Sequence, residues 1–422
     1  MSISFTNNCS NEVEVAVNRW GNDGSTEYFK VARNKRENWD RSDQRGFVMS
    51  IKTAGFTYAF YVMRDSNIVA KNDTGNTLII ENNSNILQPI ARTDSFTSDW
   101  MTQNWGAISS KTFSDITLPG SHDTGMSELH GNKATKPVLG PYTKTQKLNV
   151  FQQIVEAGIR CLDLRPCYYL ANDASDVPTG YYTAHYTIKD EQYWIGLIGR
   201  SWADICSDLA AALSSLGKNE IVLIELSHAK QLFETGSATD LSDAQQQTIV
   251  TSLLDSLGNY VYKGDDSTNF FSLTPSGISS TGPRVFIWMS DSSLQNCGKK
   301  AADGIFNTNN LEYYNSWPHN ETDSIADFLS DTTKLLNDLQ NKNGHAPLYL
   351  GWHITAQFPF LGDDLEKKAK TLNPKLAGYI QNWIKDKVLI QSNSPKFISW
   401  DFVDGNNLTL LQSCIDLTKR NW

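Results

Sequence analysis

Residues 116–126, ITLPGSHDTGM, place a histidine and a carboxylate side by side where a short strand is expected to end. The apolar residues before Pro119 and Gly120 are typical of a strand, and the Pro-Gly pair is typical of a turn. His122 and Asp123 could together serve proton transfer, because a carboxylate fixes the tautomer of an imidazole and raises its basicity. A polar loop explains a single His-Asp pair equally well. Its significance therefore depends on which residues end the other strands.

Three more segments carry polar residues on strand-like stretches. In GIRCLDLRP, strand alternation puts Asp163 and Arg165 on one face. Parallel strands are normally apolar on both faces, so these charges are costly unless an internal ion pair or a function uses them. His185 lies in YYTAHYT, where a hydrogen-bonded core histidine is the alternative. Asp401 lies in FISWDFVDG, and Asp404 is its nearby competitor.

Two imidazoles, a guanidinium and carboxylates suit the cleavage of a phosphodiester by an internal hydroxyl group. One histidine removes the proton from the attacking hydroxyl, and the other protonates the leaving oxygen. An arginine stabilises charge on the phosphoryl oxygens through its forked donors. If these side chains meet in one pocket, we expect this chemistry.

The elements that must position them alternate between strand-like and amphipathic segments from about residue 107 onward. The expected strands are 115–119, 159–166, 181–187, 220–226, 284–289, 348–354 and 396–402. Such alternation is typical of parallel βα units and favours an α/β fold of the (β/α) TIM-barrel type, distorted or incomplete. In such barrels the chemistry gathers at the carboxyl ends of strands. No G-x-G-x-x-G follows any strand, which removes the usual support for a nucleotide-binding fold.

The first ninety or so residues follow a different pattern of short strands and polar turns. EVEVAVNRW alternates cleanly, and GFVMSIKTA, YAFYVM and TLIIEN follow at short intervals. We therefore expect a small all-β sandwich over residues 1–95 and the barrel over residues 96–422. The sandwich is interpreted as a lectin-like or membrane-targeting module, with a structural cap on the barrel as the alternative.

Composition narrows the classes of partner. The 422 residues carry a net charge of −9, which argues against nucleic acid. No apolar stretch is long enough to span a bilayer, and the first residues lack the pattern of a signal peptide. The 6 cysteines form no CxxC motif. Cys161 and Cys167 flank one strand, and whether they pair stays open.

The residues above resemble the phosphatidylinositol-specific phospholipase C family, X-domain type. The resemblance rests on LPGSHDTGM at 118–126, QKLNVFQQIVEAGIRCLDLRP at 146–166, TAHYT at 183–187 and VLIELSHAK at 222–230. It implies cleavage of phosphatidylinositol by the inositol 2-hydroxyl, giving diacylglycerol and inositol 1,2-cyclic phosphate. It covers residues 100–230 well and the remainder thinly.

The resemblance also implies a role for each site residue. His122 would be the general base, held by Asp401. His185 would be the general acid toward the diacylglycerol oxygen, held by Asp123. Arg165 would bind the phosphate, with Asp163 orienting it.

Two positions bear on metal use, and three more, besides Asp163, are candidates for substrate binding. Calcium-dependent members of the family carry asparagine and a carboxylate where this chain has Asp123 and Arg165, so the resemblance implies a metal-independent enzyme without cofactors. Glu225, Asp291 and Trp352 are candidates for contacting the inositol hydroxyls. A buried ion pair is the alternative for Glu225.

The expected partner is a phospholipid at a membrane or micelle surface, and we expect a monomer. Secretion is favoured by the resemblance. The alternatives are another phosphodiester substrate, such as a glycosylated inositol lipid or a glycerophosphodiester, and a catalytically silent protein that binds lipid or sugar.

Overall fold

The computed structural model divides the chain into two compact units, Met1–Thr97 and Ser98–Trp422. In the first unit it describes nine strands and Thr97. In the second it describes every residue except 132, 134, 174, 190–191, 280–281, 317–323, 343–345, 355–363, 405–408 and 421–422. Among the described residues no helix is both long and apolar enough to cross a bilayer.

The first unit consists of two antiparallel sheets, of four and five strands, in the orders β4-β1-β8-β7 and β3-β2-β5-β6-β9. The strands are β1 Ser2–Asn7, β2 Val13–Arg19, β3 Thr26–Val31, β4 Arg36–Asp40, β5 Phe47–Thr53, β6 Phe56–Arg64, β7 Ile68–Lys71, β8 Thr77–Asn82 and β9 Ser84–Thr93. The alternating segment EVEVAVNRW supplies β2, which pairs with β3 and β5. The packing of the two sheets as a sandwich remains a prediction.

The second unit is built on a curled parallel sheet of eight strands in the order β19-β18-β15-β11-β10-β22-β21-β20. The strands are β10 Leu118–Ser121, β11 Cys161–Leu164, β15 Ile221–Leu226, β18 Arg284–Met289, β19 Ile305–Phe306, β20 Tyr314–Asn315, β21 Leu348–Trp352 and β22 Phe397–Trp400. Among the described residues β19 and β20 are not paired, so the sheet is an open half-barrel. This mixed α/β architecture is compatible with a TIM-like fold.

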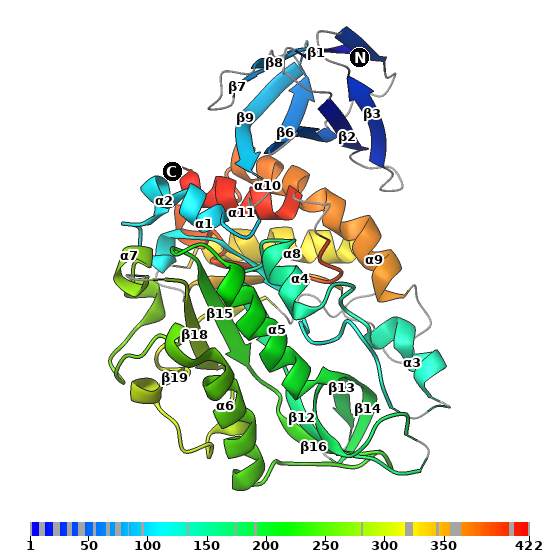
Figure 1. Ribbon diagram of the computed structural model, residues 1–422, viewed down its shortest axis with the longest axis vertical. Coiled ribbons are helices and arrows are strands. Elements are labelled where there is room, and N and C mark those ends of the chain that lie inside the picture. The colour runs from blue at the N-terminus through cyan, green and yellow to red at the C-terminus, as the bar shows by residue number, and fades with distance from the viewer. Residues whose placement is uncertain are drawn as a thin grey trace. The chain divides into compact units, whose positions relative to one another are not determined.

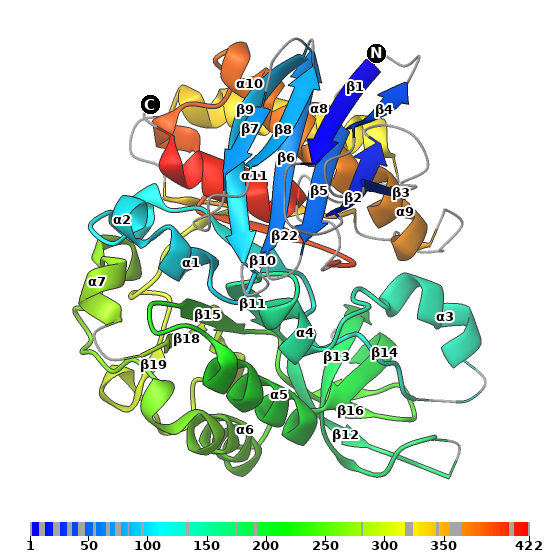
Figure 2. The same ribbon diagram turned by 45° about the horizontal axis from the view of Figure 1, so that its top comes forward.

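Helices cover the outer face of this sheet. The longer helices are α3 Lys136–Thr143, α4 Val150–Val155, α5 Trp202–Ser215, α6 Asp243–Leu257, α8 Ile325–Gln340, α9 Leu365–Leu372, α10 Leu376–Lys385 and α11 Thr409–Lys419. Figures 1 and 2 show this cover for α5 and α6, which lie along β15 and β18. The short helices are α1 Trp100–Gln103, α2 Trp105–Ile108 and α7 Pro275–Ile278. Several start with side-chain caps, such as Ser242 and Gln245 at α6, which satisfy backbone N–H groups that the helix leaves unpaired.

The alternation of side chains along each strand separates an apolar outer face from a mixed inner face. Leu162 and Leu164 of β11 and Ile224 of β15 pack in the outer core with α5 and α6. Asp163 and Glu225, one residue away on the same strands, lie on the opposite face. The sequence pattern therefore places Asp163 and Glu225 inside the curl of the parallel sheet.

One expected strand of the barrel lies elsewhere. Residues 181–187 belong to β13 Gly180–Lys189, which pairs antiparallel with β12 Pro166–Leu170 and β14 Tyr193–Ser201. With β16 Lys230–Phe233 and β17 Ala238–Thr239 these strands form a separate five-stranded sheet, the side sheet. A parallel neighbour needs a crossover of a dozen residues or more, usually helical. Between β11 and β14 the structure has no helix among its described residues, so the chain folds back on itself instead.

Candidate active site

Three adjacent strands bring the central residues of the site together. In the sheet β10 lies between β11 and β22. His122 follows the last residue of β10, Arg165 follows β11 and Asp401 follows β22. Because the carboxyl ends of parallel strands meet at one edge of the sheet, these three side chains become neighbours.

His122 is held between a carboxylate and a guanidinium. Its Nδ1 lies 2.8 Å from Asp401 Oδ1, and its Nε2 lies 3.3 Å from Arg165 Nη2. Asp401 can only accept at Nδ1 when it is ionised, and Arg165 can only donate at Nε2. These contacts select the tautomer with the proton on Nδ1 and the lone pair on Nε2. Nε2 is thereby the ring atom that can accept a proton.

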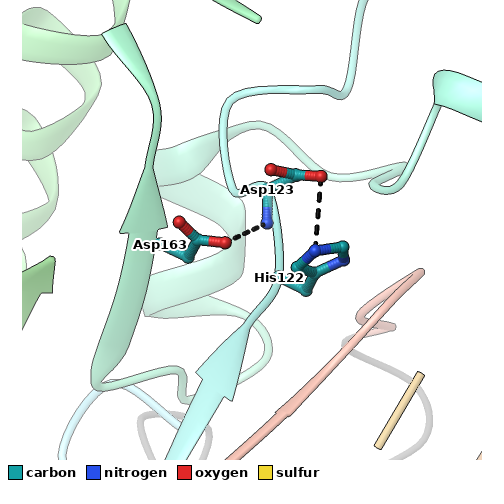
Figure 3. Close-up of side chains that lie close together, drawn as sticks. All are labelled: His122, Asp123 and Asp163. Atoms are coloured by element: carbon teal, nitrogen blue, oxygen red, sulfur yellow. Dashed lines mark hydrogen bonds and ion pairs between the residues drawn. The ribbon is translucent and has the colours of Figure 1, made fainter. Parts of the chain in front are cut away.

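Arg165 is held by two carboxylates. Its Nε lies 2.8 Å from Asp123 Oδ1, and its Nη2 donates to Asp163 Oδ2 at 3.0 Å. Asp163 Oδ2 also accepts the backbone N–H of Asp123 at 3.1 Å, a contact drawn in Figure 3. All three residues are buried. The planar guanidinium is thus fixed beside His122.

His185 reaches the site from the side sheet. Its Nδ1 donates toward the carbonyl oxygen of Thr143 at 3.0 Å and lies 3.4 Å from Asp123 Oδ2. Its ring centroid is 6.0 Å from that of His122. The side chain of His185 is 18% exposed, against 5% for His122, so the second histidine lies nearer to solvent. The two rings therefore lie edge to face, and Arg165 lies beside the first of them.

Backbone strain is concentrated at this edge of the sheet. Asp123, Phe402 and His228 have positive φ angles of 43°, 51° and 53°, which are uncommon for residues other than glycine. Each follows the carboxyl end of a strand, β10, β22 or β15. Residues held in such conformations cluster at functional sites. At Asp123 this conformation accompanies a carboxylate that lies near both Arg165 and His185.

Gly125 explains how the side sheet approaches so closely. A β-carbon at this position would lie 2.4 Å from the side chain of Thr183 on β13. The Thr183 hydroxyl donates to the Gly125 carbonyl at 3.1 Å. Only glycine at position 125 allows Thr183 to come this close. Thr183 lies two residues before His185 on β13, so this contact also positions the second histidine.

Gln146, which sequence reasoning did not single out, joins the loops that carry His122 and Asp401. Its amide donates to the carbonyl oxygens of His122 at 2.7 Å and Trp400 at 3.1 Å, and its Oε1 accepts from Val403 N at 3.1 Å. The side chain is fully buried. It fixes the spacing between the imidazole and its carboxylate.

The environment sets the charge of each group. Burial lowers the pKa of His122 to about 4, against the opposing effect of Asp123, so the ring is neutral at pH 7. Burial raises the pKa of Asp401 to about 6. Burial would also raise the pKa of Asp163, but Arg165 and His122 lower it to about 2. A neutral imidazole beside ionised carboxylates is the state that a base requires.

His122, Asp123 and Asp163 each offer one ligand atom within 4.8 Å of the others, which makes them a candidate for binding a cation (Figure 3). Calcium takes about six to eight oxygen ligands. This cluster supplies two carboxylates and a ring nitrogen, and the guanidinium of Arg165 is already paired with both carboxylates. The donor set therefore does not fit calcium.

The substrate-binding candidates lie in three different places. Glu225 lies inside the curl of the sheet, where Tyr313 donates to it at 3.3 Å, and burial together with Asp163 raises its pKa to about 8. Asp291 lies at the carboxyl end of β18 and accepts the backbone N–H of His228 at 2.6 Å. Trp352 is fully buried in the outer core, with its Nε1 3.3 Å from the Leu372 carbonyl, so the structure does not bring it to the site.

His353, next in the chain, is the residue that does reach the site. Its ring stacks on that of His122 with centroids 3.8 Å apart and planes 5° from parallel. The side chain is buried, and burial together with the nearby His122 lowers its pKa to about 3. A neutral ring thus covers one face of the His122 imidazole.

Five of the six cysteines lie in the described residues and are buried and free, namely Cys161, Cys167, Cys206, Cys297 and Cys414. Cys161 and Cys167 therefore do not form the disulfide that their spacing left open.

No family model matches the chain. An 83-residue segment, 17% of the chain, is 34% identical to a PI-PLC X domain-containing protein of Dictyostelium discoideum and covers 14% of that protein. The chain thus matches far less than two thirds of that relative.

Two solved structures align with 71% of the chain at low similarity. A calcium-dependent phosphoinositol-specific phospholipase C from a Gram-negative Pseudomonas aligns over 71% of this chain and 95% of its own, with 8% identity and a TM-score of 0.30. A Ca²⁺-dependent phosphatidylinositol-specific phospholipase C from Streptomyces antibioticus aligns over 71% and 98%, with 11% identity and a TM-score of 0.32. At such scores neither structure carries an inference about this chain. What the comparisons add to the site is weak sequence similarity, over a short segment, to a protein with a phosphatidylinositol-specific phospholipase C X domain.

Proposed function

We propose that the chain is a metal-independent phosphodiesterase of the phosphatidylinositol-specific phospholipase C type. It would cleave phosphatidylinositol-type lipids into diacylglycerol and inositol 1,2-cyclic phosphate. The observation that carries the proposal is the meeting of two histidines, His122 and His185, with ring centroids 6.0 Å apart. Arg165 lies beside His122, and Asp401 lies on the far nitrogen of that ring. The 83-residue similarity to an X domain-containing protein supports the same activity.

In the first half of the reaction, His122 acts as the base. Its Nε2 takes the proton of the inositol 2-hydroxyl while the hydroxyl oxygen attacks phosphorus. The resulting imidazolium carries its second proton on Nδ1, where Asp401 at 2.8 Å stabilises the charge. General base catalysis of this kind contributes about 10²–10⁴-fold.

In the second half, His185 acts as the acid. The Thr143 carbonyl accepts its Nδ1 proton, which leaves the Nε2 proton for the glycerol oxygen as the phosphorus–oxygen bond to diacylglycerol breaks. Asp123 Oδ2, 3.4 Å from His185 Nδ1, helps to orient the ring. The proton taken by His122 is returned to solvent.

Arg165 stabilises the charge that develops on the phosphoryl oxygens. Its guanidinium is permanently charged and is fixed in a site from which water is largely excluded, so it needs no reorganisation during the reaction. This is the role that a divalent cation would otherwise fill. We accordingly propose that no metal is required.

The lipid headgroup would enter the space inside the curl of the sheet. Glu225 offers a carboxyl group that its raised pKa keeps protonated at neutral pH, which allows it to donate or to accept a hydrogen bond from a sugar hydroxyl. Asp291, at the end of the neighbouring strand β18, is proposed as a second contact. The first unit is proposed to bind membrane or glycan.

The experiment is ³¹P NMR on phosphatidylinositol vesicles with EDTA present. The expected product signal is a five-membered cyclic phosphodiester that EDTA does not suppress. His122→Ala and His185→Ala should each abolish that signal while circular dichroism remains unchanged. Activity that EDTA removes would contradict the metal-independent mechanism.

A substrate panel separates the remaining alternatives. Vesicles of a glycosylated inositol lipid and solutions of a glycerophosphodiester test whether the same two histidines act on another headgroup. Binding to vesicles without turnover of any of these phosphodiesters would instead identify a silent lipid-binding protein and refute the proposed activity.

A further inference from the structure

A second polar pocket lies at the opposite end of the parallel sheet from the candidate active site. It has a volume of about 310 Å³ and is lined by Lys111, Asp115, Gln391, Ser394, Lys396, Leu417 and Arg420. Asp115 and Lys396 precede β10 and β22, so the pocket sits at the amino ends of the strands whose carboxyl ends lead to His122 and Asp401. It is therefore separate from the site described above.

Lys396 is the residue that makes this pocket unusual. It lies on the same face of its strand as Ile398 and Trp400, both of which belong to the apolar outer core. It is 7% exposed, and its ammonium forms no hydrogen bond or ion pair with any residue that the structure describes. A lysine withdrawn this far from water has lost part of its hydration, which an anion bound in the pocket would replace.

The other lining residues reinforce the positive charge. Lys111 donates one hydrogen bond from Nζ to the Thr418 carbonyl at 2.6 Å, which fixes its ammonium at the pocket and leaves two donors. Arg420 adds a third cation, and Asp115 is the one carboxylate among the lining residues. Three cationic side chains and one carboxylate thus line the pocket.

Polar donors without charge complete the lining. Ser394 is 3% exposed, and its hydroxyl can donate or accept a hydrogen bond.

Lys396 keeps most of its positive charge at pH 7. Burial lowers the pKa of its ammonium to about 8, against the opposing effect of Asp115.

We propose that this pocket binds a small dianionic oxyanion of the phosphate type, with Lys396 as its central ligand and Lys111 and Arg420 at its rim. A dianion suits a lining in which cationic side chains outnumber carboxylates. The tetrahedral oxygens accept from ammonium, guanidinium and hydroxyl donors at once. Binding here is independent of the proposed catalysis, since none of these residues belongs to the site around Arg165.

Isothermal titration calorimetry with inorganic phosphate tests the proposal, at constant ionic strength and with chloride as the blank. The wild-type chain should bind phosphate saturably. Lys396→Met, which removes the charge and nearly preserves the volume, should weaken binding at least tenfold. Arg420→Gln, at an exposed position that does not affect the core, should weaken it severalfold. Lys334→Met, at an exposed position that does not line the pocket, is the matched control and should bind like wild type.

A flotation assay distinguishes the source of the phosphate group. It compares vesicles of phosphatidylcholine with and without phosphatidate, again with wild type and Lys396→Met. Lys396-dependent binding of inorganic phosphate identifies a soluble ligand, and Lys396-dependent binding of phosphatidate vesicles alone identifies a lipid headgroup. The proposal is overturned if neither probe binds, or if Lys396→Met and Arg420→Gln both bind as wild type does, which would place the phosphate beside Arg165 instead.

Discussion

Replacing Asp401 by asparagine tests the part of the site on which the proposed base depends. The carboxylate accepts from His122 Nδ1 at 2.8 Å and is 3% exposed, so water cannot take its place. Asparagine keeps the size of the side chain and removes its charge. Its amide nitrogen, if turned toward Nδ1, also forces the ring proton onto Nε2.

The expected loss follows from these two effects. A hydrogen bond to a charged group contributes about 1.5–3 kcal/mol, so its loss alone corresponds to about 10- to 150-fold in rate. A ring with its proton on Nε2 cannot accept the substrate proton, which removes general base catalysis worth about 10²–10⁴-fold. The tautomer effect is the larger of the two. We expect kcat to fall by about 10³-fold with a nearly unchanged KM.

The assay is the initial rate of cyclic inositol phosphate release from phosphatidylinositol vesicles. Asp404→Asn is the matched control, because Asp404 lies three residues further along the chain and is exposed. It should retain wild-type activity. A folded Asp401→Asn variant within about tenfold of wild type, or a large loss in Asp404→Asn, would refute the assignment of Asp401.

Three further predictions concern stability and thiol reactivity. Between pH 4.5 and about 8 the folded chain holds a proton on Glu225 that the unfolded chain has lost, so this residue lowers stability by about 1.4 kcal/mol for each rise of one pH unit. Urea denaturation of Glu225→Gln should be less sensitive to pH by that slope, and identical slopes would contradict the raised pKa. Glu220→Gln leaves the fully buried Arg160, now 2.7 Å from Glu220, without its counter-charge and should lower the free energy of unfolding by about 3–5 kcal/mol; a loss below about 1 kcal/mol would refute this. The thiols of Cys161, Cys167, Cys206, Cys297 and Cys414 should react with iodoacetamide only after denaturation, and mass spectrometry of native protein labelled at any of them would contradict their burial.

Local patterns predicted the inner face of the sheet well. Alternation along CLDLR placed Asp163 and Arg165 together, and the structure has both beside His122. This inference needs only the two-residue period of a strand, which does not depend on the rest of the fold. The same period placed Asp401 opposite Trp400.

The pairing and register of neighbouring strands could not be predicted from alternation along a single strand. Alternation requires that either Trp352 or His353 point inward, but it does not say which. The choice is set by register: Trp352 pairs with Trp400, which packs in the outer core, so His353 lies alongside Asp401. The side sheet was not predicted for a related reason. TAHYT alternates as a strand of either sheet would. Only the lack of a helix between β11 and β13 among the described residues indicates that β13 pairs with β12 and β14 and not with the parallel sheet.

The two histidines of the site belong to different sheets, so their positions depend on different sets of contacts. The distance from His122 to Arg165 is set by hydrogen bonds between adjacent strands and changes only if the barrel itself deforms. The distance to His185 depends on how the side sheet docks, through contacts such as Thr183 against Gly125. Substitutions in the side sheet would therefore change the position of His185 and the protonation of the leaving group. The activation of the attacking hydroxyl by His122 would be unaffected. The two proton transfers can thus change independently during evolution.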